Sequence, residues 1–238
     1  MSWVVQLFKR RFLNESCVAL VATRDSSKRI TQLLNSLTIV EEVFGDKLGF
    51  DYDNILVYNP WGGVFKPMFE NGVLKAFTPV QLDSLPQSVL QRFQTIPLQI
   101  FLKHVDSLAV NKVKSRRFEN GKTILTLVIM YGLLHGGDEL NMAIKYWCTE
   151  PTSLMYRAGM FIIIFHENFN ILDPDVRQYV INMRVEPTFE EYLHIVNKAI
   201  EKGFKFDKNL QPHEIANMLK GLSLHKAETT LLLSSSEN

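Results

Sequence analysis

The sequence predicts an α/β fold in which a mostly parallel five-stranded sheet with helices on both faces precedes a small all-helical lobe. Up to residue 187, short apolar runs rich in β-branched residues alternate with segments whose apolar residues recur at helical spacing. From Thr188, which stands three residues before Glu191 as in a capping box, only helical patterns occur. We therefore expect an α/β domain over residues 1–187, a helical lobe over residues 188–233 and a frayed tail over residues 234–238.

The N-terminal third contains the start of a strand–helix–strand unit. Residues 16–23 form a continuous apolar run that predicts the first strand, and residues 29–44 follow with the spacing of an amphipathic helix. Residues 54–60 predict the second strand. A Pro–Trp–Gly–Gly break ends this strand, and we expect a loop or a hairpin up to Asn71.

The middle of the chain continues the alternation. Residues 78–96 begin with Thr–Pro and predict one or two short helices, which lead into a third strand over residues 98–106. Residues 107–121 are basic and are expected to form a surface loop. Residues 122–148 are expected to form two helical pieces that break at the Gly136–Gly137 pair.

The last strands and the helical lobe complete the pattern. Residues 159–165 are strongly apolar and β-branched, and they predict a central strand that is covered on both faces. A loop and a short helix over residues 166–182 lead into a fifth strand over residues 181–187. Helical segments then cover residues 188–204, 210–221 and 223–236.

The carboxyl ends of the predicted parallel strands are the expected place for a ligand. In open α/β sheets, ligands bind in the crevice outside these ends. The residues that carry the chemistry should therefore follow Thr23, Val105 and Phe165.

Composition excludes several classes of function. The 26 Lys and Arg residues balance 25 Asp and Glu residues, so no global field attracts the chain to nucleic acid or to an anionic membrane. Cys17 and Cys148 lack metal-ligand spacing and are expected to be reduced, buried thiols in a cytoplasmic protein. The apolar runs are too short or too interrupted to span a bilayer, and we expect a soluble protein.

The C-terminal third resembles the second half of an AAA-type ATPase. The segment IIIFHENFNILDPDVRQYVINMRVEP has the order of that family: a strand with a polar sensor residue, a Leu-x-Pro-x-Val-Arg helix, and a strand with a Pro-containing turn. The phrase GLSLHKAE is similar to the lid start of an AAA branch found in cyanobacteria, plastids and archaea. The resemblance implies a nucleotide-loop NTPase fold with a helical lid. Members of that branch can pair an ATPase-like domain that lacks a phosphate loop with an intact one.

The segment after the first strand lacks the features of a phosphate loop. Lys28 falls near the position of the phosphate-binding lysine, but no glycine lies between Ala22 and Ile30, and Arg29 replaces the hydroxyl that holds magnesium. Side chains other than glycine obstruct the close approach of a pyrophosphate to the backbone. We therefore expect no cofactor here, with ATP and Mg²⁺ as the alternative.

A second segment carries the end of a phosphate-loop signature. Gly121, Lys122 and Thr123 precede an apolar segment, but Arg116 stands where the first glycine should be. The segment is interpreted as a turn and a helix start, with a displaced phosphate site as the alternative.

At the end of the predicted third strand, Asp106 has two interpretations. It is the remnant of an acidic, magnesium-binding position, or it ends the strand in a salt bridge with Lys103.

Three further residues match family positions. Asn168 stands at the first sensor, where the alternative is that it only caps the local backbone. Arg177 stands where the family places an arginine finger that reaches a neighbouring subunit's nucleotide; the alternative is a surface arginine paired with Asp173 or Asp175. Lys226 in the lid is the weakest match, to the second sensor.

A basic segment leaves nucleic acid open as a partner. The predicted loop contains the basic residues, which either contact phosphates or form a solvated surface: Lys112, Lys114, Arg116 and Arg117.

The sequence analysis leads to three hypotheses about function. The first is a degenerate AAA-type module, a non-hydrolysing interaction subunit or scaffold that assembles with itself or with a catalytic AAA partner in a ring. The second is an active ATPase with an unorthodox loop at Gly121 to Thr123. The third is a clamp-loader-like, nucleic-acid-handling protein of a mobile element or virus.

Overall fold

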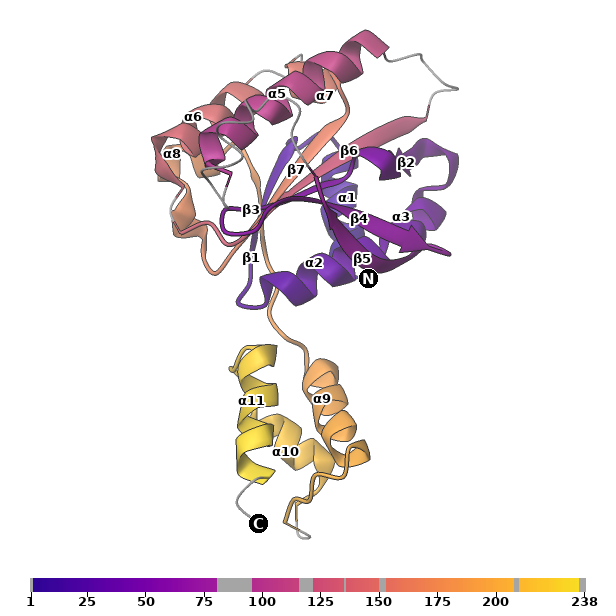
Figure 1. Ribbon diagram of the computed structural model, residues 1–238, viewed down its shortest axis with the longest axis vertical. Helices are drawn as coiled ribbons and strands as arrows, with labels where there is room; N and C mark the ends of the chain where they lie inside the picture. The colour runs from indigo at the N-terminus through magenta and orange to yellow at the C-terminus, as the bar shows by residue number, and fades with distance from the viewer. Residues whose placement is uncertain are drawn as a thin grey trace. The chain divides into compact units, whose positions relative to one another are not determined.

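The computed structural model describes residues 2–80, 96–115, 122–134, 136–149, 153–207 and 210–235. The chain divides into two compact units, Met1–Arg184 and Val185–Asn238. The first unit contains the sheet, and the described residues of the second form helices and no strand (Figure 1). The sequence pattern placed the boundary after residue 187.

The sheet has eight strands and is mixed, where the sequence predicted five strands. Its order is β5-β4-β3-β6-β7-β1-β8, and β2 pairs with β6 outside this path. The β3, β6, β7, β1 and β8 strands pair in parallel, whereas β4 and β5 add an antiparallel hairpin beside β3. The strands are β1 (Val18–Ala22), β2 (Leu48–Phe50), β3 (Leu56–Asn59), β4 (Gly63–Glu70), β5 (Val73–Pro79), β6 (Thr123–Met130), β7 (Met160–His166) and β8 (Ile181–Arg184).

Helices cover both faces of this sheet. On one face, α5 (Leu98–Ser115), α6 (Gly137–Cys148), α7 (Leu154–Arg157) and α8 (Pro174–Arg177) pack on the strands around one apolar core. On the other face lie α1 (Trp3–Phe12), α2 (Ser26–Asn35) and α3 (Leu37–Phe44) (Figure 1). Ring contacts of Trp3 with Phe165 and of Phe8 with Phe161 join α1 to β7. Short 3-10 turns lie at Gly45–Lys47, Tyr52–Asn54 and Phe169–Ile171.

The third predicted strand is wrong, because residues 98–106 belong to helix α5. Phe101, Val105 and Ala109 are fully buried at a spacing of four residues, whereas Ser107 is exposed, which is the pattern of one helix face. The predicted loop at 107–121 is also wrong as far as residue 115, where the helix ends. Residues 116–121 lie outside the described residues, as does most of the helical segment predicted at 78–96.

The first helical piece predicted within residues 122–148 is wrong as well, because Thr123–Met130 form strand β6. Residues 125–130 are all buried, since β6 lies between β3 and β7 with helices on both faces. Such a strand is apolar without alternation, and its residues also match a buried helix. The second predicted piece corresponds to α6.

The connections of β1 and β7 leave the sheet on opposite faces. Val18 and Leu20 of β1 belong to the core under α5 to α8, and so does Val176 of α8, which follows β7. Helix α2, which follows β1, contributes no residue to that core. The carboxyl ends of β1 and β7 are therefore the switch point at which open α/β sheets bind ligands.

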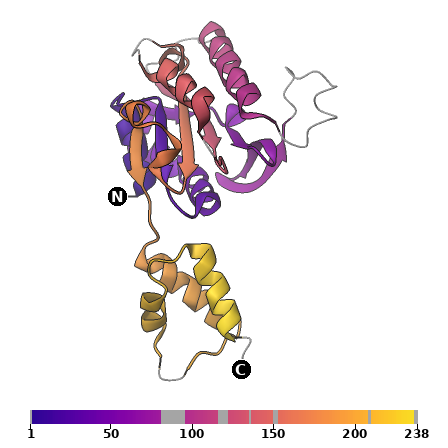
Figure 2. The same cartoon turned by 90° about the vertical axis from the view of Figure 1, so that its left-hand side faces the viewer.

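In its described residues, the second unit has three helices, which Figure 2 shows from the side. They are α9 (Phe189–Glu201), α10 (Pro212–Met218) and α11 (Leu224–Ser235). Thr188 and Glu191 form the expected capping box at the start of α9. Tyr192, Ala216 and Ala227 are among the buried residues that hold the three helices together.

The position of Ser107 inside α5 can be tested by proline substitution. Ser107→Pro should destabilise the fold by about 3 kcal/mol, because proline removes a hydrogen bond in a helix interior and clashes with the preceding turn. The matched control Ser107→Ala should stay within about 0.5 kcal/mol of the wild type. Urea unfolding followed by circular dichroism measures both, and equal stability of the two variants would place Ser107 outside a helix.

Candidate functional site

The connection from β1 to α2 consists only of Thr23, Arg24 and Asp25. The Thr23 amide donates a hydrogen bond to the His166 carbonyl at 2.7 Å, which continues the pairing of β1 with β7. The Asp25 amide donates to Thr23 Oγ1 at 3.2 Å. Thr23 and Asp25 are buried, with 2% and 6% of their surface exposed. The connection is therefore short and closed by its own hydrogen bonds.

The first turn of α2 holds the predicted phosphate-binding position. Asp25 is the N-cap residue of α2, and Lys28 is a half-buried residue of the first turn. Arg29, which replaces the magnesium-binding hydroxyl, is buried and donates from Nη1 to Gln32 Oε1 at 2.8 Å. The same Gln32 oxygen accepts from Trp3 Nε1 at 2.9 Å. Arg29 thus takes part in packing α1 against α2.

The end of β7 brings His166 and Asn168 next to this connection. His166 pairs with Ala22 in the sheet, and its Nδ1 lies 3.2 Å from the amide of Asn168. Asn168 is exposed, and its Oδ1 accepts a hydrogen bond from the Asn170 amide at 2.9 Å. The geometry matches the capping alternative that the sequence left open for Asn168.

The end of β6 supplies residues that the sequence analysis did not place at the site. Tyr131 follows β6, and its amide donates to the Tyr58 carbonyl at 3.1 Å. At Gly132, which has a φ of 70°, an added Cβ would come within 2.6 Å of Asn59 Nδ2. Residues 131–134 contain no carboxylate, so this described segment offers no acid at the position expected for magnesium. Recognising β6 as a strand would have identified this edge.

An apolar hollow of about 230 Å³ lies beside the edge formed by these strand ends. Ile30 of α2 and Tyr131 face it together with two aromatic side chains of the hairpin, Phe65 and Phe77. Ser27 and Thr31 add hydroxyl groups, and Val57 completes the lining. Residues 23–25 do not line this hollow.

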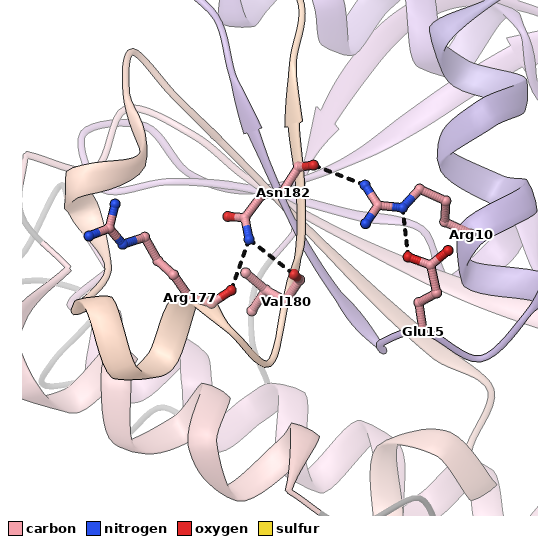
Figure 3. A network of polar contacts seen from close by, with 5 residues as sticks. All are labelled: Arg10, Glu15, Arg177, Val180 and Asn182. Atoms are coloured by element: carbon pink, nitrogen blue, oxygen red, sulfur yellow. Dashed lines mark hydrogen bonds and ion pairs between the residues drawn. The ribbon is translucent and has the colours of Figure 1, made fainter.

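Arg177 is the last residue of α8. Asn182 holds its backbone, and its side chain points away from Asn182 (Figure 3). Asn182 Nδ2 donates to the Arg177 carbonyl at 2.8 Å and to the Val180 carbonyl at 3.2 Å. The Asn182 carbonyl accepts from Arg10 Nη1 at 2.9 Å, and Arg10 Nε donates to Glu15 Oε2 at 2.6 Å. Figure 3 shows the Arg177 guanidinium pointing away from Asn182 while the Arg177 carbonyl faces it.

The ion pair considered for Arg177 does not form within the described part of the chain. There, no carboxylate lies within ion-pair distance of its guanidinium, and Asp175 instead faces Lys145 at 3.8 Å. The Asp173 amide, at the start of α8, donates to Asn141 Oδ1 of α6 at 3.1 Å. The α8 backbone is thus held from two sides, and the half-buried Arg177 side chain remains available.

Asp106 lies inside α5, so its predicted position at the end of a strand is wrong. Its Oδ1 accepts a hydrogen bond from Trp147 Nε1 at 2.7 Å, which joins α5 to α6. Burial raises the pKa of Asp106 above its ordinary value, and the Trp147 hydrogen bond opposes this rise. Lys103 is exposed on the same helix. Asp106 therefore joins two helices on the sheet face.

Two of the four basic residues fall on α5, which corrects their assignment to a loop. Lys112 forms an ion pair with Asp51, and Lys114 is exposed in the last turn of the helix. The Asp51 amide donates to the Leu125 carbonyl near the start of β6 at 2.9 Å. Lys112 thus lies toward the amino edge of the parallel strands, opposite the switch point. Arg116 and Arg117 lie outside the described residues.

The expectation that Lys122 and Thr123 open a helix is also wrong, because β6 begins at Thr123. Lys122 directly precedes β6, and its side chain lies against β2, where a Cβ added to Gly49 would come within 2.7 Å of Lys122 Cε. Both residues therefore occupy the amino end of a parallel strand, whereas phosphate sites of α/β sheets follow the carboxyl ends. Gly121 lies outside the described residues.

Lys226 belongs to the second unit and lies on α11. Its side chain is exposed, and its amide donates to Ser223 Oγ at 3.2 Å, so Ser223 caps the helix. In the described ranges of both units, no three His, Cys, Asp or Glu side chains gather as a metal site. Of the helices in those ranges, none combines the length and apolar character that a membrane crossing requires.

Comparisons with known proteins assign no family. No family model matches the sequence, and no curated protein matches it. One similar solved structure is that of PCH-2 from C. elegans, with 12% sequence identity and a TM-score of 0.45. The match covers 99% of this chain and 61% of that chain, so this chain spans less than two thirds of that protein. The AAA family and its degenerate loop therefore stay predictions.

The raised pKa of Asp106 predicts a pH dependence of stability. Between its ordinary value of 3.8 and the folded pKa, the folded chain holds more protons on Asp106 than the unfolded chain, so stability falls as pH rises through this window. Asp106→Asn should remove this fall, and the variant should gain stability relative to the wild type as pH rises from below 3.8. Denaturant unfolding across the acidic range measures the difference, with Asp138→Asn, on the exposed first turn of α6, as the control. A difference between Asp106→Asn and the wild type that does not change with pH would contradict the role of burial.

Proposed function

We propose that this chain is an ATPase-like module that does not hydrolyse nucleotide and that acts on a partner subunit through Arg177. The observation that carries the proposal is the three-residue connection between β1 and α2, with Asp25 buried at the helix start. The ATPase-like character is taken from the sequence resemblance and from the position of the switch point at β1 and β7.

The connection is unsuited to a phosphate for two reasons. A phosphate loop presents several free amides around the anion, whereas the amides of Thr23 and Asp25 already donate within the chain. The acidic Asp25 also occupies the N-cap of α2, where the helix dipole would otherwise favour the phosphate, and two negative charges there repel each other. The negative charge of Asp25 also opposes the attraction that the nearby Lys28 would give a triphosphate.

Arg177 is the residue best placed to act outside the chain. Asn182 and Asn141 hold the backbone on either side of it, so binding through its guanidinium would cost rotamer freedom of the side chain but little backbone freedom. A guanidinium is always charged and donates in a planar fork that matches phosphate oxygens. An arginine supplied in trans stabilises the charge that develops during phosphoryl transfer.

The partner that fits is a hydrolysing AAA subunit. A ring of identical copies would offer Arg177 only the same three-residue connection, with no bound phosphate to act on. A mixed assembly gives Arg177 a neighbouring nucleotide. No described contact favours the other two hypotheses, since Lys122 and Thr123 lie at the amino edge and Lys112 is paired with Asp51.

Absence of nucleotide binding is the first expected result. A ligand at roughly 100 times its Kd stabilises a protein by about 2.7 kcal/mol, so saturating Mg²⁺ and ATP should raise Tm by several degrees if they bind. We expect no rise for the wild type, and the same melting behaviour for Lys28→Ala with and without nucleotide. A saturable rise in the wild type that disappears in Lys28→Ala, together with ATP turnover, would contradict the proposal.

Loss of the trans contribution is the second expected result. In an assembly with a hydrolysing AAA subunit, Arg177→Ala should lower that subunit's kcat by roughly 10³-fold or more, because the charge donor is removed. Arg177→Lys should recover little, since an ammonium lacks the planar fork. Lys145→Ala removes a neighbouring exposed cation that faces Asp175 and serves as the control. Unchanged kcat with Arg177→Ala in a fully formed assembly would refute the role.

A further inference from the structure

The two cysteines of the chain lie side by side although 131 positions separate them. Cys17 directly precedes β1, and Cys148 is the last residue of α6. Their Sγ atoms are 3.7 Å apart. A disulfide bond is about 2 Å long, so a shift of less than about 2 Å between the sulfurs would suffice to form one.

The surroundings give the two thiols different roles. Cys17 is fully buried, and its Sγ lies 3.4 Å from the Trp147 carbonyl. Cys148 is partly exposed, and its Sγ lies 3.4 Å from Ser16 Oγ. Cys148 is therefore the more exposed of the two residues toward a peroxide that arrives from solvent.

The directions of the two pKa shifts also distinguish Cys148 from Cys17. The contact with Cys17 lowers the pKa of Cys148, and Ser16 and the positive charge of Arg11 lower it further, while burial opposes them. The contact with Cys148 and burial both raise the pKa of Cys17. Arg11 is itself held in place by a hydrogen bond from Nη2 to the Met160 carbonyl at 3.1 Å. Cys148 is the thiol that ionises first.

We propose that Cys17 and Cys148 are a peroxide-sensitive dithiol that closes reversibly to a disulfide. The Cys148 thiolate attacks one oxygen of hydrogen peroxide, the O–O bond breaks, and hydroxide leaves and is protonated to water. The sulfenic acid on Cys148 is then attacked by the Cys17 sulfur, the S–O bond breaks, and the Cys17 proton leaves with the hydroxyl group as water. Two thiols lose two electrons, and one peroxide is reduced to two waters.

The bond would connect two elements that matter for the rest of the unit. β1 follows Cys17 and leads to the connection at Thr23, and α6 carries Asn141, which binds the start of α8. Oxidation would therefore tie the start of β1 to α6, the helix that binds the start of α8. Ser16, whose Oγ accepts from the Val18 amide at 3.0 Å, keeps the approach to β1 ordered on the Cys17 side.

Intact-mass spectrometry of the full chain without reductant tests the proposal. Treatment with hydrogen peroxide should lower the mass by about 2 Da, remove both thiols that titrate in denaturant, and be reversed by dithiothreitol. Because the chain has only two cysteines, this mass change identifies one intramolecular bond. Cys17→Ser should instead accumulate a sulfenic acid on Cys148 that dimedone traps, whereas Cys148→Ser should leave Cys17 unmodified in the folded chain.

Several outcomes would overturn it. Two thiols still titrating after peroxide treatment, disulfide-linked dimers in place of the monomer mass loss, or oxygen addition to Cys148 without a disulfide would each exclude the dithiol. A dimedone adduct on Cys17 in the Cys148→Ser variant would reverse the assigned roles. Where a variant does not fold, the mass and thiol count of the wild-type chain decide the matter alone.

Discussion

The hydrogen bond from the Thr23 amide to the His166 carbonyl sets what the carboxyl edge of this sheet can bind. It extends the pairing of β1 with β7 by one step, so the chain has only Arg24 and Asp25 left before α2 begins. A loop of that length cannot surround a phosphate with amides. The buried acid at the N-cap of α2 follows from the same constraint, because the short turn places Asp25 there.

The polar groups at the ends of β1 and β7 and those at α8 differ in their hydrogen bonding. At the ends of β1 and β7, the amide of Thr23 and the side chain of Asn168 form hydrogen bonds within the chain. At α8, the contacts of Asn182 and Asn141 involve the backbone only, which leaves the Arg177 side chain without a described carboxylate beside it. These differences in hydrogen bonding at the strand ends and at α8 are the basis on which we propose that Arg177 acts on a neighbouring molecule.

Much of the fold was readable from the sequence, and the errors have a physical origin. The runs at β1, β7 and β8 and the capped helix at Thr188 carry strong local signals. Residues 98–106 and 123–130 were exchanged between strand and helix, because a short buried run fits either period. For residues 98–106, the helix is distinguished from a strand only by the burial of every fourth residue, which continues to Ala109. Helix α1 went unassigned, and the hairpin of β4 and β5 was one of two alternatives.

The candidate site was predictable to the extent that it depends on local sequence. The missing glycines before Ile30 indicated an altered connection, but its length and the burial of Asp25 depend on how β1 pairs with β7. Backbone amide shifts in NMR spectra during titration with Mg²⁺ and a non-hydrolysable ATP analogue test the central claim most directly. A closed connection predicts that the amides of residues 23–28 do not move. Saturable shifts confined to those amides would contradict it and would restore a nucleotide to this edge.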